Sequence, residues 1–85
     1  MKIKYGTRLH NVDITQICYT TLLDNGIITI PPDDNVRARL FGDPLHGILK
    51  KVFIYTDFIV DGKIHEYDYT TTVSIDIVNN TICSV

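Results

Sequence analysis

The sequence contains no tryptophan, a single methionine and a single alanine, Ala38. Alanine is the strongest helix former, and it is rare here, whereas the chain has thirteen isoleucines and ten threonines. β-Branched residues of this kind favour strands. No run of about 18 apolar residues is present, so we expect no transmembrane helix and no direct membrane insertion. The composition therefore predicts a β-rich fold.

Charge and cysteine are also sparse. The net charge is −2 at pH 7, so the chain has no overall positive field that would attract nucleic acid, and we expect no nucleic-acid partner. Residues 1–5 are too short and too alternating for a signal peptide, which predicts an intracellular, cytoplasmic location. Cys18 and Cys83 form no CxxC pair, and we expect both to be buried, reduced thiols.

A chain of 85 residues is the size of one domain, and we predict a single domain over residues 1–85. The expected fold is mainly β, a small antiparallel β-sandwich with one short helix near residues 14–24. Apolar residues recur there at helical spacing, behind Asp13 as a helix cap or an Asx-type turn together with Thr15. The β-branched residues of the same segment leave a strand as the alternative.

Strands are predicted over residues 3–6 and 27–30, joined to the rest by polar connections. Residues 7–12 read as one connection and residues 33–35 as a solvated loop. Residues 36–41 alternate in polarity, which predicts a half-buried extended segment with a basic side. Asn79-Asn80 predicts a turn, followed by a short tail.

The longest apolar segment, residues 52–60, runs into Asp61-Gly62, a pair typical of a type I′ hairpin turn. That turn would place Val52 opposite Thr71 and would put alternate residues of both strands on one apolar face. The opposite face carries Phe53, Tyr55 and Ile59. We expect a helix, a second sheet or a partner subunit to cover it.

Several short motifs follow one another along the chain: Tyr5-Gly6, residues 12–15, residues 22–30, and Phe41-Gly42-Asp43-Pro44 with Gly47 and Lys50. In this order they resemble the C-terminal domain of unknown function of mitochondrial J-domain proteins of subfamily C, over about residues 3–77. The resemblance implies a β-rich accessory module that mediates protein contacts, in a family whose larger members are linked to mitochondrial membrane organisation. The sequence has no His-Pro-Asp motif, so the resemblance implies no stimulation of Hsp70. The module would stand alone, without the J domain, the membrane-associated middle region or a transit peptide.

Turn-forming residues are assigned structural roles. Gly42, Asp43 and Pro44 predict a rigid turn, and we expect Asp43 to form an ion pair with Lys50 that ties this turn to the following strand. The structural candidates are Asp13, Thr15, Gly42, Pro44, Gly47, Asp61 and Gly62. The three histidines are too widely spaced for a zinc motif, no nucleophile motif is present, and we expect no metal and no cofactor.

The densest basic segment lies between residues 37 and 51. The candidate binding residues are Arg37, Arg39, Phe41, Asp43, Lys50, Lys51 and Tyr55. A basic patch beside aromatic residues fits an acidic protein surface, and a solvated strand edge is the alternative interpretation. The sequence predicts a non-catalytic protein interaction or assembly module that binds a partner or a second copy. A ligand module recognising carbohydrate through tyrosines and the Asp43 loop is the first rival, and an enzyme is the second.

Overall fold

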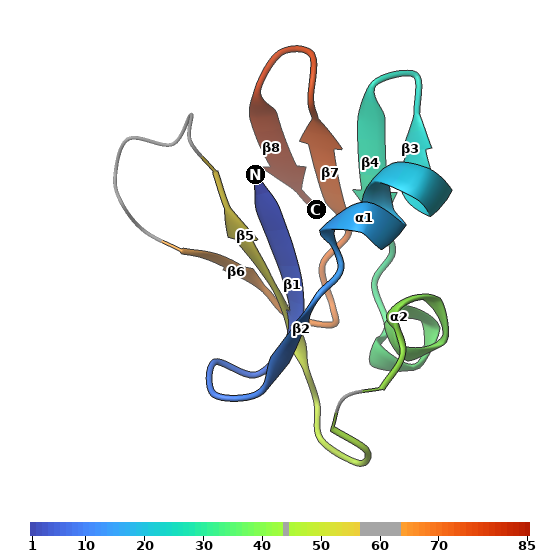
Figure 1. Ribbon diagram of the computed structural model, residues 1–85, viewed down its shortest axis with the longest axis vertical. Coiled ribbons are helices and arrows are strands. Elements are labelled where there is room, and N and C mark those ends of the chain that lie inside the picture. The colour runs from blue at the N-terminus through green and yellow to red at the C-terminus, as the bar shows by residue number, and fades with distance from the viewer. Residues whose placement is uncertain (44, 57–63) are drawn as a thin grey trace.

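The computed structural model describes residues 1–43, 45–56 and 64–85. Its strands form two antiparallel four-stranded sheets, which confirms the predicted β-sandwich class (Figure 1). The first sheet has the order β2-β1-β5-β6 and the second the order β3-β4-β7-β8. The strands are β1 (Lys2–Gly6), β2 (Asn11–Asp13), β3 (Leu23–Asp24), β4 (Ile27–Ile30), β5 (Lys51–Tyr55), β6 (His65–Tyr67), β7 (Val73–Asp76) and β8 (Thr81–Ser84). The helical elements are α1 (Thr15–Ile17), η1 (Cys18–Leu22) and α2 (Asp34–Phe41).

The core takes alternate side chains from the central strands of both sheets. Its buried members are Ile3, Tyr5, Ile14, Cys18, Ile28, Ile30, Phe41, Val52, Ile54, Val73 and Ile75. This set confirms the predicted burial of alternate residues in residues 52–54 and 73–75. Fully burying one such aliphatic side chain contributes about 1.5 to 3 kcal/mol, so the core is the main source of stability in a domain of this size.

The predicted helix near residues 14–24 is present in a shorter and wider form. α1 continues into η1, a single π-helical turn, and the chain becomes strand β3 at Leu23. Asp13 ends β2 and accepts a hydrogen bond from the Thr15 backbone N–H at 2.9 Å, the Asx-type arrangement expected as one alternative. The Thr15 hydroxyl accepts a hydrogen bond from the Ile3 backbone N–H at 2.8 Å. Asp13 and Thr15 thus anchor the start of this segment to β1.

The predicted extended segment at residues 36–41 and the predicted loop at residues 33–35 are wrong, because helix α2 occupies this stretch. Asp33 caps the helix by accepting a hydrogen bond from the Asn35 backbone N–H at 2.8 Å. Gly42, with a φ of 84°, ends it. Arg37 and Phe41 are buried one helical turn apart, so a helical period and not a strand period places side chains inward here.

The β5–β6 hairpin pairs in a different register from the predicted one. Val52 lies opposite Tyr67 and not opposite Thr71. The offset is an even number of residues, so the same side chains still face the core. Asp68 accepts hydrogen bonds from the backbone and the hydroxyl of Thr70, which turns the chain out of this sheet before it enters β7. The predicted turn at Asp61-Gly62 lies outside the described residues.

Two predicted connections contain strands. β2 forms within residues 7–12 and continues to Asp13, and β8 forms in the predicted tail; both pair with the preceding strand as hairpins. The predicted turn at Asn79-Asn80 is confirmed, with Asn80 at a φ of 56° and with Asp76 accepting a hydrogen bond from the Asn79 backbone N–H at 3.0 Å. None of the helices in the described ranges has the length and apolar character needed to cross a bilayer.

Candidate functional site

Arg37 is a fully buried cation on the inner side of α2. Its guanidinium donates hydrogen bonds to the carbonyl oxygens of Pro31 and Asp68, both at 2.7 Å, and to that of Thr71. Burial lowers the pKa of Arg37 below its usual value, yet an arginine stays protonated in a folded protein. The side chain therefore ties the helix to the end of β4 and to the connection between β6 and β7.

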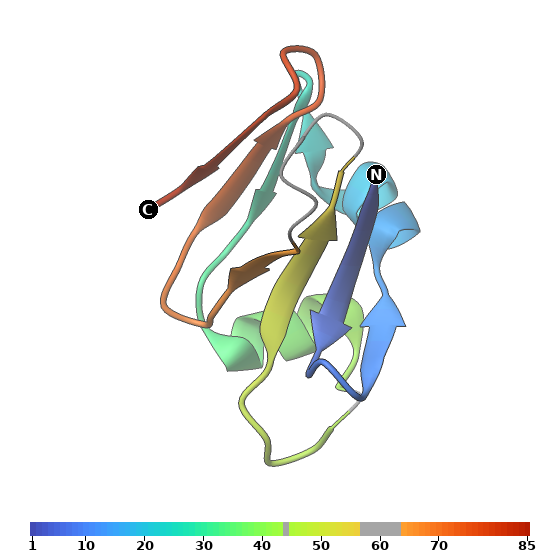
Figure 2. The same cartoon turned by 90° about the vertical axis from the view of Figure 1, so that its left-hand side faces the viewer.

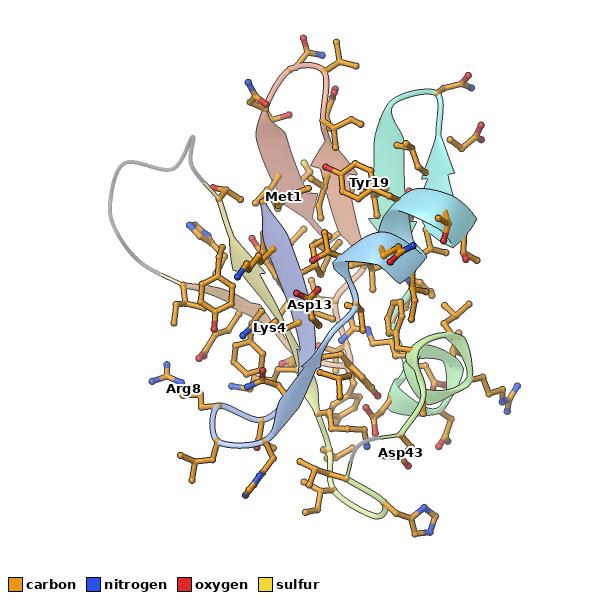
Figure 3. The ribbon with its side chains drawn as sticks, viewed as in Figure 1. Met1, Lys4, Arg8, Asp13, Tyr19 and Asp43 are labelled. Atoms are coloured by element: carbon orange, nitrogen blue, oxygen red, sulfur yellow. The ribbon has the colours of Figure 1, made fainter. Side chains whose placement is uncertain are left out.

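Lys50 is the second buried cation, with 2% of its surface exposed. Its Nζ lies 2.9 Å from Asp34 Oδ2 and 3.1 Å from Asp43 Oδ1, so the predicted Asp43–Lys50 ion pair is present. The same ammonium donates hydrogen bonds to the carbonyl oxygens of Leu45 and Ile48. Asp43 lies between the end of α2 and the loop that leads to β5 (Figure 3). Lys50 thus joins both ends of α2 to this loop.

Tyr5 completes the cluster from the first sheet. Its hydroxyl donates a hydrogen bond to Asp34 Oδ1 at 2.5 Å, and its ring packs against Phe41 with the ring centroids 5.4 Å apart. Burial, and then the hydrogen bond to Asp34, raises the pKa of Tyr5 above its ordinary value. The Asp34 carboxylate is consequently held between a phenol and an ammonium group.

The contacts of this cluster stabilise the charged form of Lys50. Burial alone would lower the pKa of Lys50, but its hydrogen bonds with Asp34 and Asp43 outweigh burial and raise it. A lysine nucleophile or base needs a lowered pKa, and a general acid or base works best with a pKa near neutrality. In the parts of the chain that the structure describes, no group of three His, Cys, Asp or Glu side chains could hold a metal ion.

The predicted basic surface patch is wrong, because the structure separates its members. Arg37, Phe41 and Lys50 are buried, whereas Arg39 and Lys51 are exposed. Residues two apart on a helix point about 200° away from each other, and neighbours at a strand entrance point to opposite faces. The alternation therefore sends Lys50 to the inner side shared with Val52 and leaves Lys51 outside.

The opposite face of β5 is covered by its own neighbours. Phe53 is buried and borders a hollow of about 220 Å³, whose other lining residues are Gly6, Thr7, Arg8, Leu49, Lys51 and Glu66. Among these lining residues, Glu66 pairs with Arg8 at 2.5 Å and with Lys51 at 3.7 Å. Tyr55 is half-buried, with Lys4 Nζ 5.6 Å from its ring centroid. Charged side chains thus lie beside Phe53 and Tyr55, while Ile59 lies outside the described residues.

An exposed apolar surface lies at the end of the domain where the loop leads to β5, and it was not among the predicted site residues. Ile48 and Leu49 are 49% and 63% exposed, although Asp43 and Lys50 fix the loop around them through hydrogen bonds with Leu45 and Ile48. Gly47 has a φ of 79°, the conformation its predicted turn role requires. The sequence signal was available: apolar residues interrupt a turn-rich loop. Figure 2 shows this loop at the lower end of the molecule.

Leu49 borders three hollows. One, of about 420 Å³, is lined by Pro32, Asp33, Asp34, Asn35, Leu49, Tyr69 and Thr70. The second lies over the Asp43 loop and measures about 280 Å³, and the third is the hollow above Phe53. We call Pro32, Asp33, Ile48, Leu49 and Tyr69 the Leu49 surface. Tyr69 is exposed here and not buried as a core residue, since the chain has left the first sheet at Asp68.

The two cysteines lie in different environments. Cys18 is buried, as predicted, and burial raises the pKa of its thiol to about 12. Cys83 is exposed on β8, so the predicted burial of this residue is wrong. Both thiols are free in this structure.

Stability is expected to fall in acid. Hydrogen bonds lower the pKa of the carboxyl groups of Asp13, Asp43, Glu66, Asp68 and Asp76. A lowered pKa means that the folded state binds protons less readily than the unfolded state, so this stabilisation is present above about pH 4 and is lost as the pH falls further. Urea unfolding should give a constant free energy from about pH 8 to 5 and a steep decrease below about pH 4. A free energy that is unchanged down to about pH 2 would contradict these shifts.

Comparison of the chain with family models, with curated proteins and with solved structures finds no match. The resemblance to the C-terminal domain of J-domain proteins therefore stays a prediction.

Proposed function

We propose that this chain is a non-catalytic protein-binding module and that it binds its partner through the Leu49 surface. The observation that carries the proposal is the exposure of Ile48 and Leu49 on a loop that Lys50 and Asp43 hold in place. Exposed aliphatic side chains on a flexible segment need no explanation. On a loop fixed by a buried ammonium group, they form a preorganised contact.

Preorganisation matters because binding must offset the entropy of ordering the contact residues. Fully burying one leucine contributes about 1.5 to 3 kcal/mol, and a fixed loop loses little freedom on binding. Tyr69 adds an aromatic side chain beside Leu49, and aromatic residues are frequent anchors of protein interfaces. These features favour a partner that inserts an apolar side chain next to Leu49.

Charge at the rim narrows the chemistry of the partner. The hollow of about 420 Å³ is lined by the acidic residues Asp33 and Asp34 together with Leu49 and Tyr69. Asp34 is paired with Lys50, whereas Asp33 is exposed at the start of α2. A partner segment with an apolar side chain followed by a lysine or arginine complements this rim. We therefore expect a partner with positive charge, whereas the predicted basic patch would have bound an acidic partner.

The test compares Leu49→Asp with Val78→Asp in affinity capture from the native cell lysate, followed by quantitative mass spectrometry. Val78 is a matched control, since it is 73% exposed and lies at the β7–β8 turn. A protein that the wild type and Val78→Asp retain, and Leu49→Asp loses by at least about tenfold, is the expected partner, because a buried aspartate costs several kcal/mol. Purified components should then reproduce the loss. Equal capture by both variants would contradict the proposed surface.

A small-ligand module is the second candidate, and the hollow beside Tyr69 is the observation that favours it. Asn35 and Thr70 line the same hollow as the exposed ring and offer polar groups there, a composition suited to a sugar. Asp43 belongs to a different hollow and is engaged by Lys50, so the tyrosine and not the Asp43 loop would bind the ligand. Ligand-observed NMR with a glycan panel tests this candidate. Binding that Tyr69→Ala abolishes would support it, and no binding would remove it.

A further inference from the structure

Strand β8 forms an outer edge of the second sheet. It pairs with β7 on one side, and within residues 1–43, 45–56 and 64–85 no strand pairs with its other side. Figure 2 shows it as the outermost strand, next to the C-terminus and away from the loop that carries Leu49. An edge strand presents unpaired N–H and C=O groups, which are a template for pairing with another chain.

The other sheet edges carry features that discourage such pairing. β2 contains Asp13, β6 contains Glu66 in an ion pair with Arg8, and β3 is two residues long with Asp24 as its second. β8 has the sequence Thr-Ile-Cys-Ser and contains no charged residue and no proline. Charges, proline and short length are the usual means of protecting an edge. β8 is the described edge strand that has none of them.

The hydrogen-bonding pattern identifies which groups of β8 face outward. The backbones of Thr72 and Val85 exchange both N–H···O bonds, each at 3.0 Å. Bonded and non-bonded pairs alternate along an antiparallel ladder, so Cys83 and Thr81 bond inward to β7. The N–H and C=O groups of Ile82 and Ser84 therefore point away from β7, toward the open edge.

We propose that β8 pairs antiparallel with β8 of a second copy and joins the two second sheets into one continuous sheet. A two-fold axis that places Ile82 opposite Ser84 of the second copy uses the outward groups of both residues in both chains. The same register places Cys83 opposite Cys83 of the second copy in a non-bonded pair. Cα atoms in such pairs are about 4.5 Å apart, which lies within the range that a disulfide can bridge. This inference is independent of the proposed function, because β8 contributes nothing to the Leu49 surface.

Sedimentation velocity over a series of concentrations tests the pairing in reducing buffer. The wild type should shift from monomer to dimer as its concentration rises. Cys83→Lys should stay monomeric, because it places like charges opposite each other across the two-fold axis. Thr29→Lys is the matched control, exposed on β4 of the same sheet, and should dimerise like the wild type. At concentrations where the wild type is monomeric, both variants should keep its melting temperature, because both replaced side chains are exposed.

The register has its own readout. Oxidised glutathione, as the oxidant, exchanges with the two Cys83 thiols to give one disulfide and two molecules of reduced glutathione. We expect a covalent dimer from the wild type at concentrations where the dimer forms, and none from Cys83→Ser. Two outcomes would overturn the proposal: a wild type that stays monomeric at every concentration, or a Cys83→Lys dimer as stable as the wild type. Loss of the dimer in Leu49→Asp with retention in Cys83→Lys would place the contact on the Leu49 surface instead and would also overturn it.

Discussion

Replacing Arg37 with methionine is expected to lower the free energy of unfolding by about 3 kcal/mol or more. Methionine fills a similar volume but cannot donate to the buried carbonyl oxygens of Pro31, Asp68 and Thr71. A buried acceptor that loses its donor costs about 1 to 3 kcal/mol. A domain of this length has a total stability of roughly 4 to 13 kcal/mol, so the variant should be close to unfolding at physiological temperature.

Urea and thermal unfolding measure this effect, and Arg39→Met is the matched control. Arg39 lies on the same helix and is exposed, so the control should change the free energy of unfolding by less than about 0.5 kcal/mol. The Arg37 variant should melt roughly 12 to 24 °C below the wild type. Equal melting temperatures for the two variants would show that Arg37 does not have the buried, donating role described here.

Replacing Lys50 with methionine is expected to cost about 3 to 5 kcal/mol, the range observed when one partner of a buried ion pair is removed. The loss leaves the largely buried Asp34 carboxylate without its cation and leaves the Leu45 and Ile48 carbonyls without a donor. Asp43 contributes less to the cost, because it is exposed and can be solvated. Lys51→Met, the neighbouring exposed lysine, should change stability by less than about 0.5 kcal/mol.

A double-mutant cycle separates the ion pair from simple packing. Asp34→Asn removes the carboxylate charge, so combining it with Lys50→Met should cost clearly less than the sum of the two single changes. Costs that simply add would mean that the two side chains do not interact, which would contradict the 2.9 Å contact between them.

The sequence predicts the sandwich well because alternating polarity identifies the core-facing side chains even when the predicted strand register is wrong. Val52 and Ile54 face the core although their partner strand is offset from the predicted register, since the offset is even. Helix α2 was not predicted, although Asp33 before it and Gly42 after it are ordinary helix boundary signals. In residues 36–41, alternating polarity was given more weight than these boundary signals. The buried side chains, Arg37 and Phe41, are four residues apart, which is the spacing of one helical turn.

The candidate site was harder to predict from the sequence than the fold. The Asp43–Lys50 pair was predictable because the two residues flank one short loop. The burial of Arg37 was not, because its acceptors lie in segments far along the chain, at Asp68 and Thr71, and no local pattern indicates them. The sequence alone does not indicate whether a basic side chain is buried or exposed. Burial depends on whether the folded chain supplies hydrogen-bond acceptors for the cation. Arg37 and Lys50 find such acceptors, so two members of the expected binding patch are internal anchors.

These anchors connect the fold to the proposed function. Arg37 holds α2 against the end of β4, and Lys50 joins α2 to the loop that presents Ile48 and Leu49. Weakening Lys50 should therefore loosen the Leu49 surface before it exposes the core. Partner binding and loop rigidity are expected to change together in variants of Asp43, whose carboxylate contacts both Lys50 and the Leu45 backbone N–H.

The most direct test of this account is the reactivity of Lys50 and Lys51 toward an amine-acetylating reagent under native conditions, resolved by tandem mass spectrometry. The two neighbours have the same chemistry and differ in exposure, with 2% and 51% of their side chains accessible. Lys51 should be acetylated quickly, and Lys50 only when urea unfolds the domain. Equal rates for the two lysines in the native state would place Lys50 on the surface and would contradict the internal anchor on which the fixed Leu49 loop depends.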